Sequence, residues 1–301
     1  MAGGRGAGIG RRAPSRHGGR GAGHSPSFTQ HDPGPVTRVL AGRAGAVALA
    51  AGLLAAGCRP QRGRVEPAPA AGQVVLPPDY DPARAYPVVE ILPATGSTAA
   101  TLLQMFLVRV GLGRFADEPL GAQVAALRPY LFPEAGRARR GVILVFARGR
   151  GSFDDYRTAQ AWARTIARYE RQVLADLGAV AQTHRVDAKR LVLAGFSMGG
   201  DLSWAIALRH PEVVHGAIVM ASRATYRPDP AGASAVMSAG TRFFLTMGDA
   251  DQRIRQRLAR AAARTLGEWG VPHRFETLHG ARHEPAPPEV FGKALDFVLA
   301  P

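Results

Sequence analysis

The sequence is poor in cysteine and lysine, and it has no apolar run long enough to span a membrane. Cys58 is the single cysteine among 301 residues, so no disulfide can form within the chain. Lys189 and Lys293 are the only lysines, and the other basic residues are arginines. This skew indicates a GC-rich coding sequence rather than nucleic-acid binding. The apolar stretch at residues 44–57 is shorter than the roughly 20 residues that a spanning helix needs.

The motifs of several cofactor-binding classes are also missing. We find no cluster of metal-ligating residues and no dinucleotide fingerprint, and Arg148-Gly149-Arg150-Gly151 does not follow the phosphate-loop pattern. We therefore expect no metal and no cofactor. Five arginines gather in one region without interleaved aromatic residues, which predicts a solvated face or a contact with anionic lipid and no nucleic-acid partner. They are Arg137, Arg139, Arg140, Arg148 and Arg150.

The first 57 residues differ in composition from the rest. Residues 1–35 are rich in Gly, Arg, Ser, His and Pro, a composition that favours disorder; alternatively they are not translated, if Val36 is the true start. Residues 36–57 combine a basic flank, a short apolar stretch and small residues, as an export signal does. Seven arginines and one aspartate in residues 1–57 account for +6 of the formal charge of +15.

Cys58 follows Leu53-Leu54-Ala55-Ala56-Gly57, which resembles the lipobox of bacterial lipoproteins. The resemblance implies cleavage before Cys58, lipidation of its thiol and a membrane anchor in the bacterial cell envelope. A plain cleaved signal, with a secreted or periplasmic product, and an uncleaved anchor are the alternatives. Residues 58–71 are predicted to form a tether, and residues 72–301 a single domain.

Apolar runs and helical periods alternate along this domain. Strands are predicted at 73–76, 86–92, 141–146, 190–195, 216–221, 243–247 and 274–278, and helices at 101–110, 157–183, 199–209, 252–269 and 288–299. Residues 111–140 have no clear period and are predicted as loop with short helices. This alternation is typical of an α/β fold, a mostly parallel sheet with helices on both faces.

The most informative motif is Gly195-Phe196-Ser197-Met198-Gly199. It lies between a predicted buried strand and an alanine-rich helix. A serine on such a sharp turn needs glycine two positions away on each side, because the backbone is crowded there. The context favours a nucleophile elbow over an ordinary tight turn.

Serine needs a base to become a nucleophile, and the base needs an orienting acid. In this class of sheet the order along the chain is Ser, acid, His. Asp251 is the preferred acid and His283 the preferred base, both in loops at the carboxyl ends of predicted strands. Asp249 and His279 are the fallbacks, and Asp249 is also the candidate N-terminal cap of the helix near Gln252. Four other histidines in the domain are interpreted as connecting or edge residues without an acid nearby: His184, His210, His215 and His273.

Attack on a carbonyl produces an oxyanion that needs two N–H donors. The backbone of Met198 supplies one, and the loop Pro93-Ala94-Thr95-Gly96-Ser97 is predicted to supply the other from Thr95. A simple glycine-containing turn is the alternative interpretation of this loop.

With these residues in place, the chain resembles the α/β-hydrolase superfamily, in its esterase, phospholipase and dienelactone hydrolase-like branch. Further segments that carry the resemblance are Leu76-Pro77-Pro78-Asp79-Tyr80, Tyr86-Pro87-Val88-Val89 and Val186-Asp187. The resemblance implies Ser197, Asp251 and His283 as nucleophile, acid and base, with Met198 and Thr95 at the oxyanion hole. The chain departs from the family at Pro93-Ala94, where His-Gly is usual, and strands preceding residue 73 are missing, which implies a sheet trimmed at its N-terminal edge.

The sequence therefore predicts a serine hydrolase that cleaves a small-molecule or lipid ester of a carboxylic acid. A non-catalytic binding lipoprotein with the same fold, and a peptidase or acyltransferase with the same triad, are the alternatives.

Overall fold

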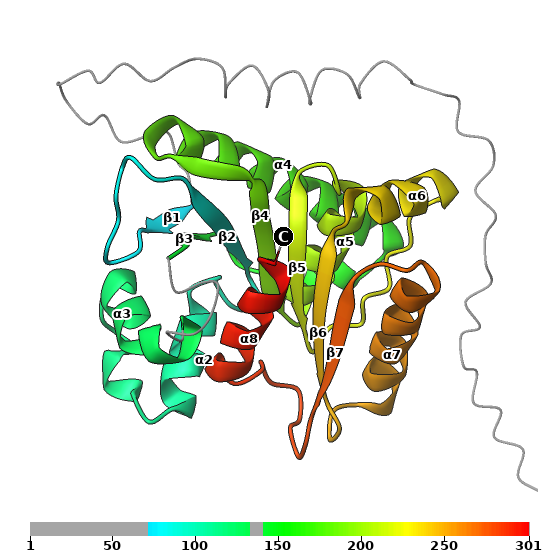
Figure 1. Ribbon diagram of the computed structural model, residues 1–301. Coiled ribbons are helices and arrows are strands. Elements are labelled where there is room, and N and C mark those ends of the chain that lie inside the picture. The colour runs from blue at the N-terminus through cyan, green and yellow to red at the C-terminus, as the bar shows by residue number, and fades with distance from the viewer. Residues whose placement is uncertain (1–71, 133–140, 301) are drawn as a thin grey trace, which may run out of the picture. The chain divides into compact units, whose positions relative to one another are not determined.

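The computed structural model describes residues 72–132 and 141–300, whose strands form one sheet in the order β1-β3-β2-β4-β5-β6-β7 (Figure 1). β1 is antiparallel to β3, and every other neighbouring pair is parallel. The strands are β1 (Gln73–Val75), β2 (Tyr86–Leu92), β3 (Ile143–Phe146), β4 (Val186–Phe196), β5 (Val214–Met220), β6 (Arg242–Gly248) and β7 (His273–Leu278).

The predicted α/β class is confirmed. The β2 and β3 strands are buried along their whole length, which explains the continuous apolar run of β3 and leaves Glu90 as a buried acidic residue in the otherwise largely apolar β2. Among the described strands β1 is at the edge of the sheet and pairs with β3. The predicted absence of strands before residue 73 concerns residues that lie almost entirely outside the described part of the chain. Because β2 to β7 run parallel, the loops that follow them meet at one edge of the sheet.

Helices cover both faces of the sheet, with α8 crossing in front of it and α4 and α5 behind in Figure 1. One hydrophobic layer lies between the sheet and α4 to α7, and the other between the sheet and α2, α3 and α8. The helices are α2 (Thr101–Arg109), α3 (Leu120–Leu131), α4 (Ala159–Thr183), α5 (Met198–Arg209), α6 (Pro230–Ala239), α7 (Arg253–Glu268) and α8 (Pro288–Val298).

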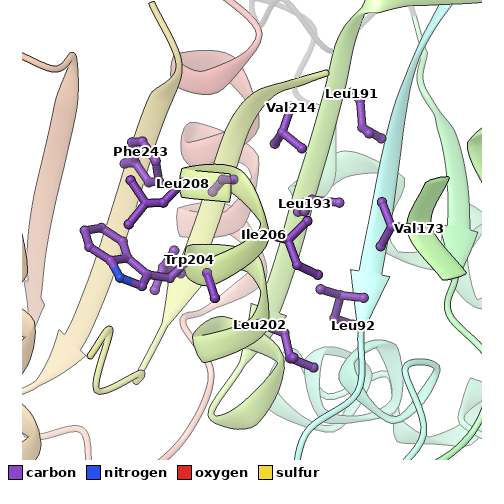
Figure 2. Close-up of a cluster of buried hydrophobic side chains, with 14 of the residues drawn as sticks. Leu92, Val173, Leu191, Leu193, Leu202, Trp204, Ile206, Leu208, Val214 and Phe243 are labelled. Atoms are coloured by element: carbon purple, nitrogen blue, oxygen red, sulfur yellow. The ribbon is translucent and has the colours of Figure 1, made fainter. Parts of the chain in front are cut away.

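Helix α5 is the centre of the first layer. All but one of its residues are buried, and Figure 2 shows its Leu202 and Ile206 on the side of the labelled residues of β2, β4 and α4, and its Trp204 on the side of Phe243. The Trp204 ring also meets Phe243 of β6 edge-on, with 5.3 Å between ring centroids. This packing fixes the start of α5, and with it the turn from β4.

Two helices were not predicted. Helix α3 lies in the stretch 111–140, for which only loop and short helices were expected. A helix of this length was not predicted because Gly121 and Pro129 obscure its period. Its buried positions are Gln123, Val124, Leu127 and Leu131. Helix α6 begins at Pro230, capped by the Asp229 carboxylate, which accepts the Gly232 N–H. Its short, alanine-rich sequence has little periodicity, because only Val236 is buried.

The predictions for residues 1–35, 36–57 and 58–71, including lipidation of Cys58, lie outside the described residues. So do Arg137, Arg139 and Arg140 of the arginine cluster. None of the helices in the described residues is long and apolar enough to cross a membrane.

Candidate active site

Ser197 occupies the turn between β4 and α5 in a backbone conformation that is rare for a residue with a side chain. Its φ is 56° and its ψ is −114°, and such strain persists only where the surroundings enforce it. A Cβ built at Gly195 would overlap the backbone of Gly199, and one built at Gly199 would overlap the Leu92 carbonyl. The glycines of the motif are therefore required by close backbone approach, and the turn has the geometry of a nucleophile elbow.

The structure brings Ser197, His283 and Asp251 together. His283 Nε2 lies 3.0 Å from Ser197 Oγ, and His283 Nδ1 lies 2.9 Å from Asp251 Oδ2. Asp251 follows β6 and its side chain is 1% exposed, whereas His283 follows β7 and its side chain is 34% exposed. Three residues that are far apart in the chain thus form one hydrogen-bonded row at the carboxyl edge of the sheet.

Each partner is fixed by further contacts. The second oxygen of Asp251, Oδ1, accepts the Gln252 N–H at 2.6 Å. The imidazole of His283 packs against the Phe196 ring with 5.0 Å between centroids. The Ala250 N–H donates to the Ala281 carbonyl at 3.0 Å and ties the two loops together. The side chains of Asp251 and His283 are consequently held in place by their surroundings as well as by each other.

The row assigns the donor and acceptor atoms. A carboxylate can only accept, so the proton of neutral His283 lies on Nδ1, and Nε2 is left to accept the Ser197 hydroxyl proton. This arrangement can increase the nucleophilicity of a serine oxygen.

The fallback residues form a separate pair. His279 Nδ1 lies 3.0 Å from Asp249 Oδ2, and Asp249 Oδ1 accepts the Gly280 N–H at 2.7 Å. These hydrogen bonds, that from His279 first, lower the pKa of Asp249. The prediction that Asp249 caps the following helix is wrong, because α7 begins after Gln252 and has no side-chain cap. The carboxylate of Asp249 is used instead to hold the loop after β7.

The expected oxyanion donors lie at the start of α5 and in the loop that follows β2. Met198 is the first residue of α5, so its N–H has no partner within the helix. The Ala94 carbonyl accepts hydrogen bonds from the Ser97 N–H at 3.1 Å and the Ser97 hydroxyl at 3.2 Å. The Thr95 N–H belongs to the same trans peptide as that carbonyl and points the opposite way. Within the described residues neither the Met198 nor the Thr95 N–H donates to a protein acceptor.

A buried network under the elbow was not predicted from the sequence. The Asp201 carboxylate accepts from the Tyr156 and Ser222 hydroxyls, both at 2.6 Å, and from the N–H groups of Arg223 and Ala224. Burial, followed by the Asp201 charge, raises the pKa of Tyr156 well above its ordinary value. The network holds the loop after β5, in which Ala224 has a φ of 48°. The available signal was an aspartate in an otherwise apolar helix start.

A second unpredicted cluster lies between β2 and α4. Glu90 is fully buried, and neither of its oxygens has a hydrogen-bond partner among the described residues. Burial raises the pKa of Glu90, and the charge of Asp176 on α4 raises it further. Arg148 Nη2 lies 3.5 Å from Asp176 Oδ1, an ion pair without hydrogen-bond geometry.

Three basic residues have roles other than those expected. Arg148 pairs with Asp176, and Arg150 donates to the Gly96 carbonyl. These two members of the arginine cluster therefore make contacts within the chain in addition to facing solvent. His210 lies 2.7 Å from Glu170 and 3.0 Å from Glu212, which corrects the interpretation that it has no acid nearby. Burial raises the pKa of Glu170, but hydrogen bonds from His210 and Arg209 outweigh it and lower that pKa to about 2.

Three of the solved structures that are similar to this chain are esterases or hydrolases, and the one with a TM-score of 0.50 agrees with its fold. A CE1 ferulic acid esterase from the anaerobic fungus Anaeromyces mucronatus is 14% identical with a TM-score of 0.50, over 75% of this chain and 82% of that one. A further ferulic acid esterase is 18% identical (TM-score 0.48; 71% of this chain, 85% of that one). The fluorophosphonate-binding serine hydrolase F of Staphylococcus aureus is 12% identical (TM-score 0.46; 76% and 91%). At these identities the likeness concerns the fold alone.

No curated protein matches the chain in sequence. One family model does match, over residues 68–267, and its description is "Esterase: Putative esterase". The matched range covers well over half of the chain and contains β1 to α7 with the elbow. The chain therefore belongs to this esterase family, is a hydrolase of the esterase type and has the α/β-hydrolase fold.

Proposed function

We propose that the protein is a serine hydrolase that cleaves carboxylic esters through an acyl-enzyme intermediate. The observation that carries the proposal is the hydrogen-bonded row from Asp251 through His283 to Ser197, with the serine on a strained elbow. An orienting acid, a base and a nucleophile in this order are the minimum set for acyl transfer.

In the acylation half, His283 Nε2 takes the Ser197 hydroxyl proton as Oγ attacks the ester carbonyl carbon. The carbonyl π bond opens, and the resulting oxyanion is bound by the N–H groups of Met198 and Thr95. When the carbonyl re-forms, the carbon–oxygen bond to the alcohol breaks, and His283 delivers the same proton to the leaving oxygen. Asp251 stabilises the imidazolium that exists between the two transfers.

Deacylation repeats these steps with water as the nucleophile. His283 accepts a proton from water, the hydroxide oxygen attacks the acyl carbon, and the proton returns to Ser197 Oγ as the acid leaves. The enzyme is regenerated without any group beyond its own side chains and backbone. The substrate class we propose is a small-molecule or lipid ester, since the site lies at the carboxyl edge of the sheet, where His283 is partly exposed.

The test uses the purified protein with p-nitrophenyl acetate and butyrate, and with a fluorophosphonate probe that labels activated serines. We expect turnover with an initial burst of p-nitrophenolate and covalent labelling. Ser197→Ala should abolish the labelling and lower kcat by at least about 10³-fold. Ser238→Ala, an exposed serine on α6, is the matched control and should change neither.

Absence of both turnover and labelling in folded protein would contradict the proposal and favour a non-catalytic binding protein. Acyl transfer to an added alcohol in preference to water would indicate an acyltransferase, and cleavage of amides at a rate comparable to esters would indicate a peptidase.

A further inference from the structure

The loop that supplies the Thr95 donor is bonded to a second loop, the one that follows β3. Thr95 and Gly151 form a parallel bridge, and Thr98 and Arg150 form an antiparallel one. Two backbone hydrogen bonds connect the loops, from the Gly96 N–H to the Gly151 carbonyl at 2.9 Å and from the Gly151 N–H to the Ser97 carbonyl at 3.2 Å. The Arg150 guanidinium adds a third, to the Gly96 carbonyl at 2.5 Å.

These bonds fix consecutive peptide groups of the oxyanion loop. The Ala94–Thr95 peptide is held by Ser97 through its carbonyl, and the Thr95–Gly96 peptide by Gly151 through its N–H. The Gly96–Ser97 peptide is held by Arg150 through its carbonyl. Because each peptide is planar, fixing these groups leaves the Thr95 N–H one direction in which to point. Gly96, with a φ of 75°, makes this turn possible.

Gly151 also lies against both donor segments. A Cβ built at this position would overlap the Ala94 carbonyl oxygen and Met198 Cε. Ala94 belongs to the peptide that carries one donor N–H, and Met198 carries the other. A side chain at position 151 would therefore displace the Ala94 carbonyl, and with it the peptide that carries the Thr95 N–H.

The loop after β3 is itself anchored at both ends. Arg148 pairs with the buried Asp176 of α4. At the other end, Ser152 and Asp155 form a capping box, and Asp155 Oδ1 accepts the Thr165 hydroxyl at 2.6 Å. Arg150 and Gly151 thus project from a fixed segment onto the oxyanion loop.

We infer that Arg150 and Gly151 form a positioning brace for the oxyanion loop, which sets the direction of the Thr95 N–H in the transition state. This inference rests on the proposed function. Arg150 is a positioning residue, because it contacts the donor loop and not the reacting atoms. Preorganised donors stabilise the transition state without having to reorient during the reaction. A loosened loop should therefore lower kcat more than it raises KM.

The experiment compares Arg150→Ala with Arg157→Ala, an exposed arginine of the next turn whose side chain pairs with the exposed Asp154. With p-nitrophenyl acetate we expect Arg150→Ala to lower kcat about 10-fold, with KM changed less than about twofold. Arg157→Ala should match the wild type. The urea midpoints of all three proteins should coincide, because Arg150 is exposed.

A readout that a purely structural role would not change is the affinity for an aryl trifluoromethyl ketone, which adds to Ser197 and places an oxyanion in the hole. Its inhibition constant should rise in Arg150→Ala by the same factor by which kcat/KM falls. Arg150→Lys, with one remaining donor, should recover part of both. Ser97→Ala, which removes one bond to the Ala94 carbonyl, should lower kcat in the same direction.

Wild-type kcat and inhibitor affinity in Arg150→Ala would overturn the inference, as would a loss that follows a lowered urea midpoint. An active wild type with an unaffected Arg150→Ala refutes the brace alone. A wild type without turnover or Ser197-dependent labelling refutes the proposed function, and the brace with it.

Discussion

Asp249 and Asp251 are two residues apart in one loop, yet each has its own histidine. The Asp251 side chain is 1% exposed and hydrogen-bonds to His283, whereas Asp249 is 38% exposed and bonds to His279, which is almost fully exposed. A carboxylate orients an imidazole best where water does not compete for its oxygens. Burial therefore distinguishes the two aspartates in a way that their spacing in the sequence does not.

This difference predicts unequal effects of two isosteric substitutions. In Asp251→Asn the amide can donate to His283 Nδ1, which favours the wrong tautomer and removes the base from Ser197. We expect kcat to fall by about 10³- to 10⁴-fold with little change in the circular dichroism spectrum. Asp249→Asn should change kcat less than about threefold, because its partner lies outside the row. Equal losses in steady-state ester hydrolysis would contradict the assignment.

At the residue scale, glycine spacing marks the elbow at Ser197, and the order of the loops limits the acid to Asp249 or Asp251 and the base to His279 or His283. The preference for Asp251 rests on a helix cap by Asp249 that the structure does not show, so burial separates the two aspartates and the sequence pattern does not. Arg150 could not be predicted in the same way, because its contact is with the Gly96 backbone carbonyl, 54 positions away, and any residue type offers such a carbonyl. Asp201 was missed for a related reason, since two of its partners are backbone N–H groups of the loop after β5.

At the scale of elements, strands were easier to predict than helices. A strand buried on both faces is mostly apolar, so β3 could be predicted directly from its composition, with a start only two residues from the predicted one. Helix α3 is amphipathic over a short length and contains Pro129, which removes an N–H near its end without breaking it. Its stability comes from packing against α8, which periodicity within 120–131 does not reveal.

The packing of β2 on α4 predicts a pH-dependent stability. Burial raises the pKa of Glu90 in the folded state above the ordinary glutamate value of 4.5. Folded protein therefore keeps a proton that unfolded protein releases as the pH rises above 4.5. Stability is complete below that pH and is lost as the pH rises toward the folded-state pKa. Glu90→Gln cannot ionise, so we expect it to remove this loss.

The measurement is the free energy of unfolding in urea at pH 4, 6 and 8. At pH 4 the wild type and Glu90→Gln should be similar, and at pH 8 the variant should be more stable by on the order of a few kcal/mol. Glu268→Gln, an exposed glutamate at the end of α7, is the control and should follow the wild type. If the free energy of unfolding changed with pH in the same way for the wild type and Glu90→Gln, ionisation of the buried Glu90 carboxyl would not destabilise the fold, and the prediction would be wrong.

At the scale of the whole molecule, the described fold begins at residue 72, and the segments before it carry a different kind of information. Export and lipidation are predicted from the composition of residues 36–57 and the position of Cys58 alone, and this prediction uses no information about packing. The fold and its site depend on burial, whereas an address depends on a linear pattern that a processing enzyme reads. The two predictions can therefore succeed or fail independently.

We predict that the protein, expressed from its own signal in a bacterium, is cut before Cys58 and lipidated there. Each buried methylene contributes about 0.8 kcal/mol to membrane binding, and stable anchoring needs more than one acyl chain, so the lipidated protein should partition into the detergent phase. Cys58→Ser should move to the aqueous phase and keep its ester hydrolysis, because Ser197, His283 and Asp251 are unchanged. Ser197→Ala should partition like the wild type. Mass measurement of the N-terminal peptide decides the matter: an unmodified Cys58 would contradict the anchor, and a peptide from residues 1–35 would contradict a start at Val36.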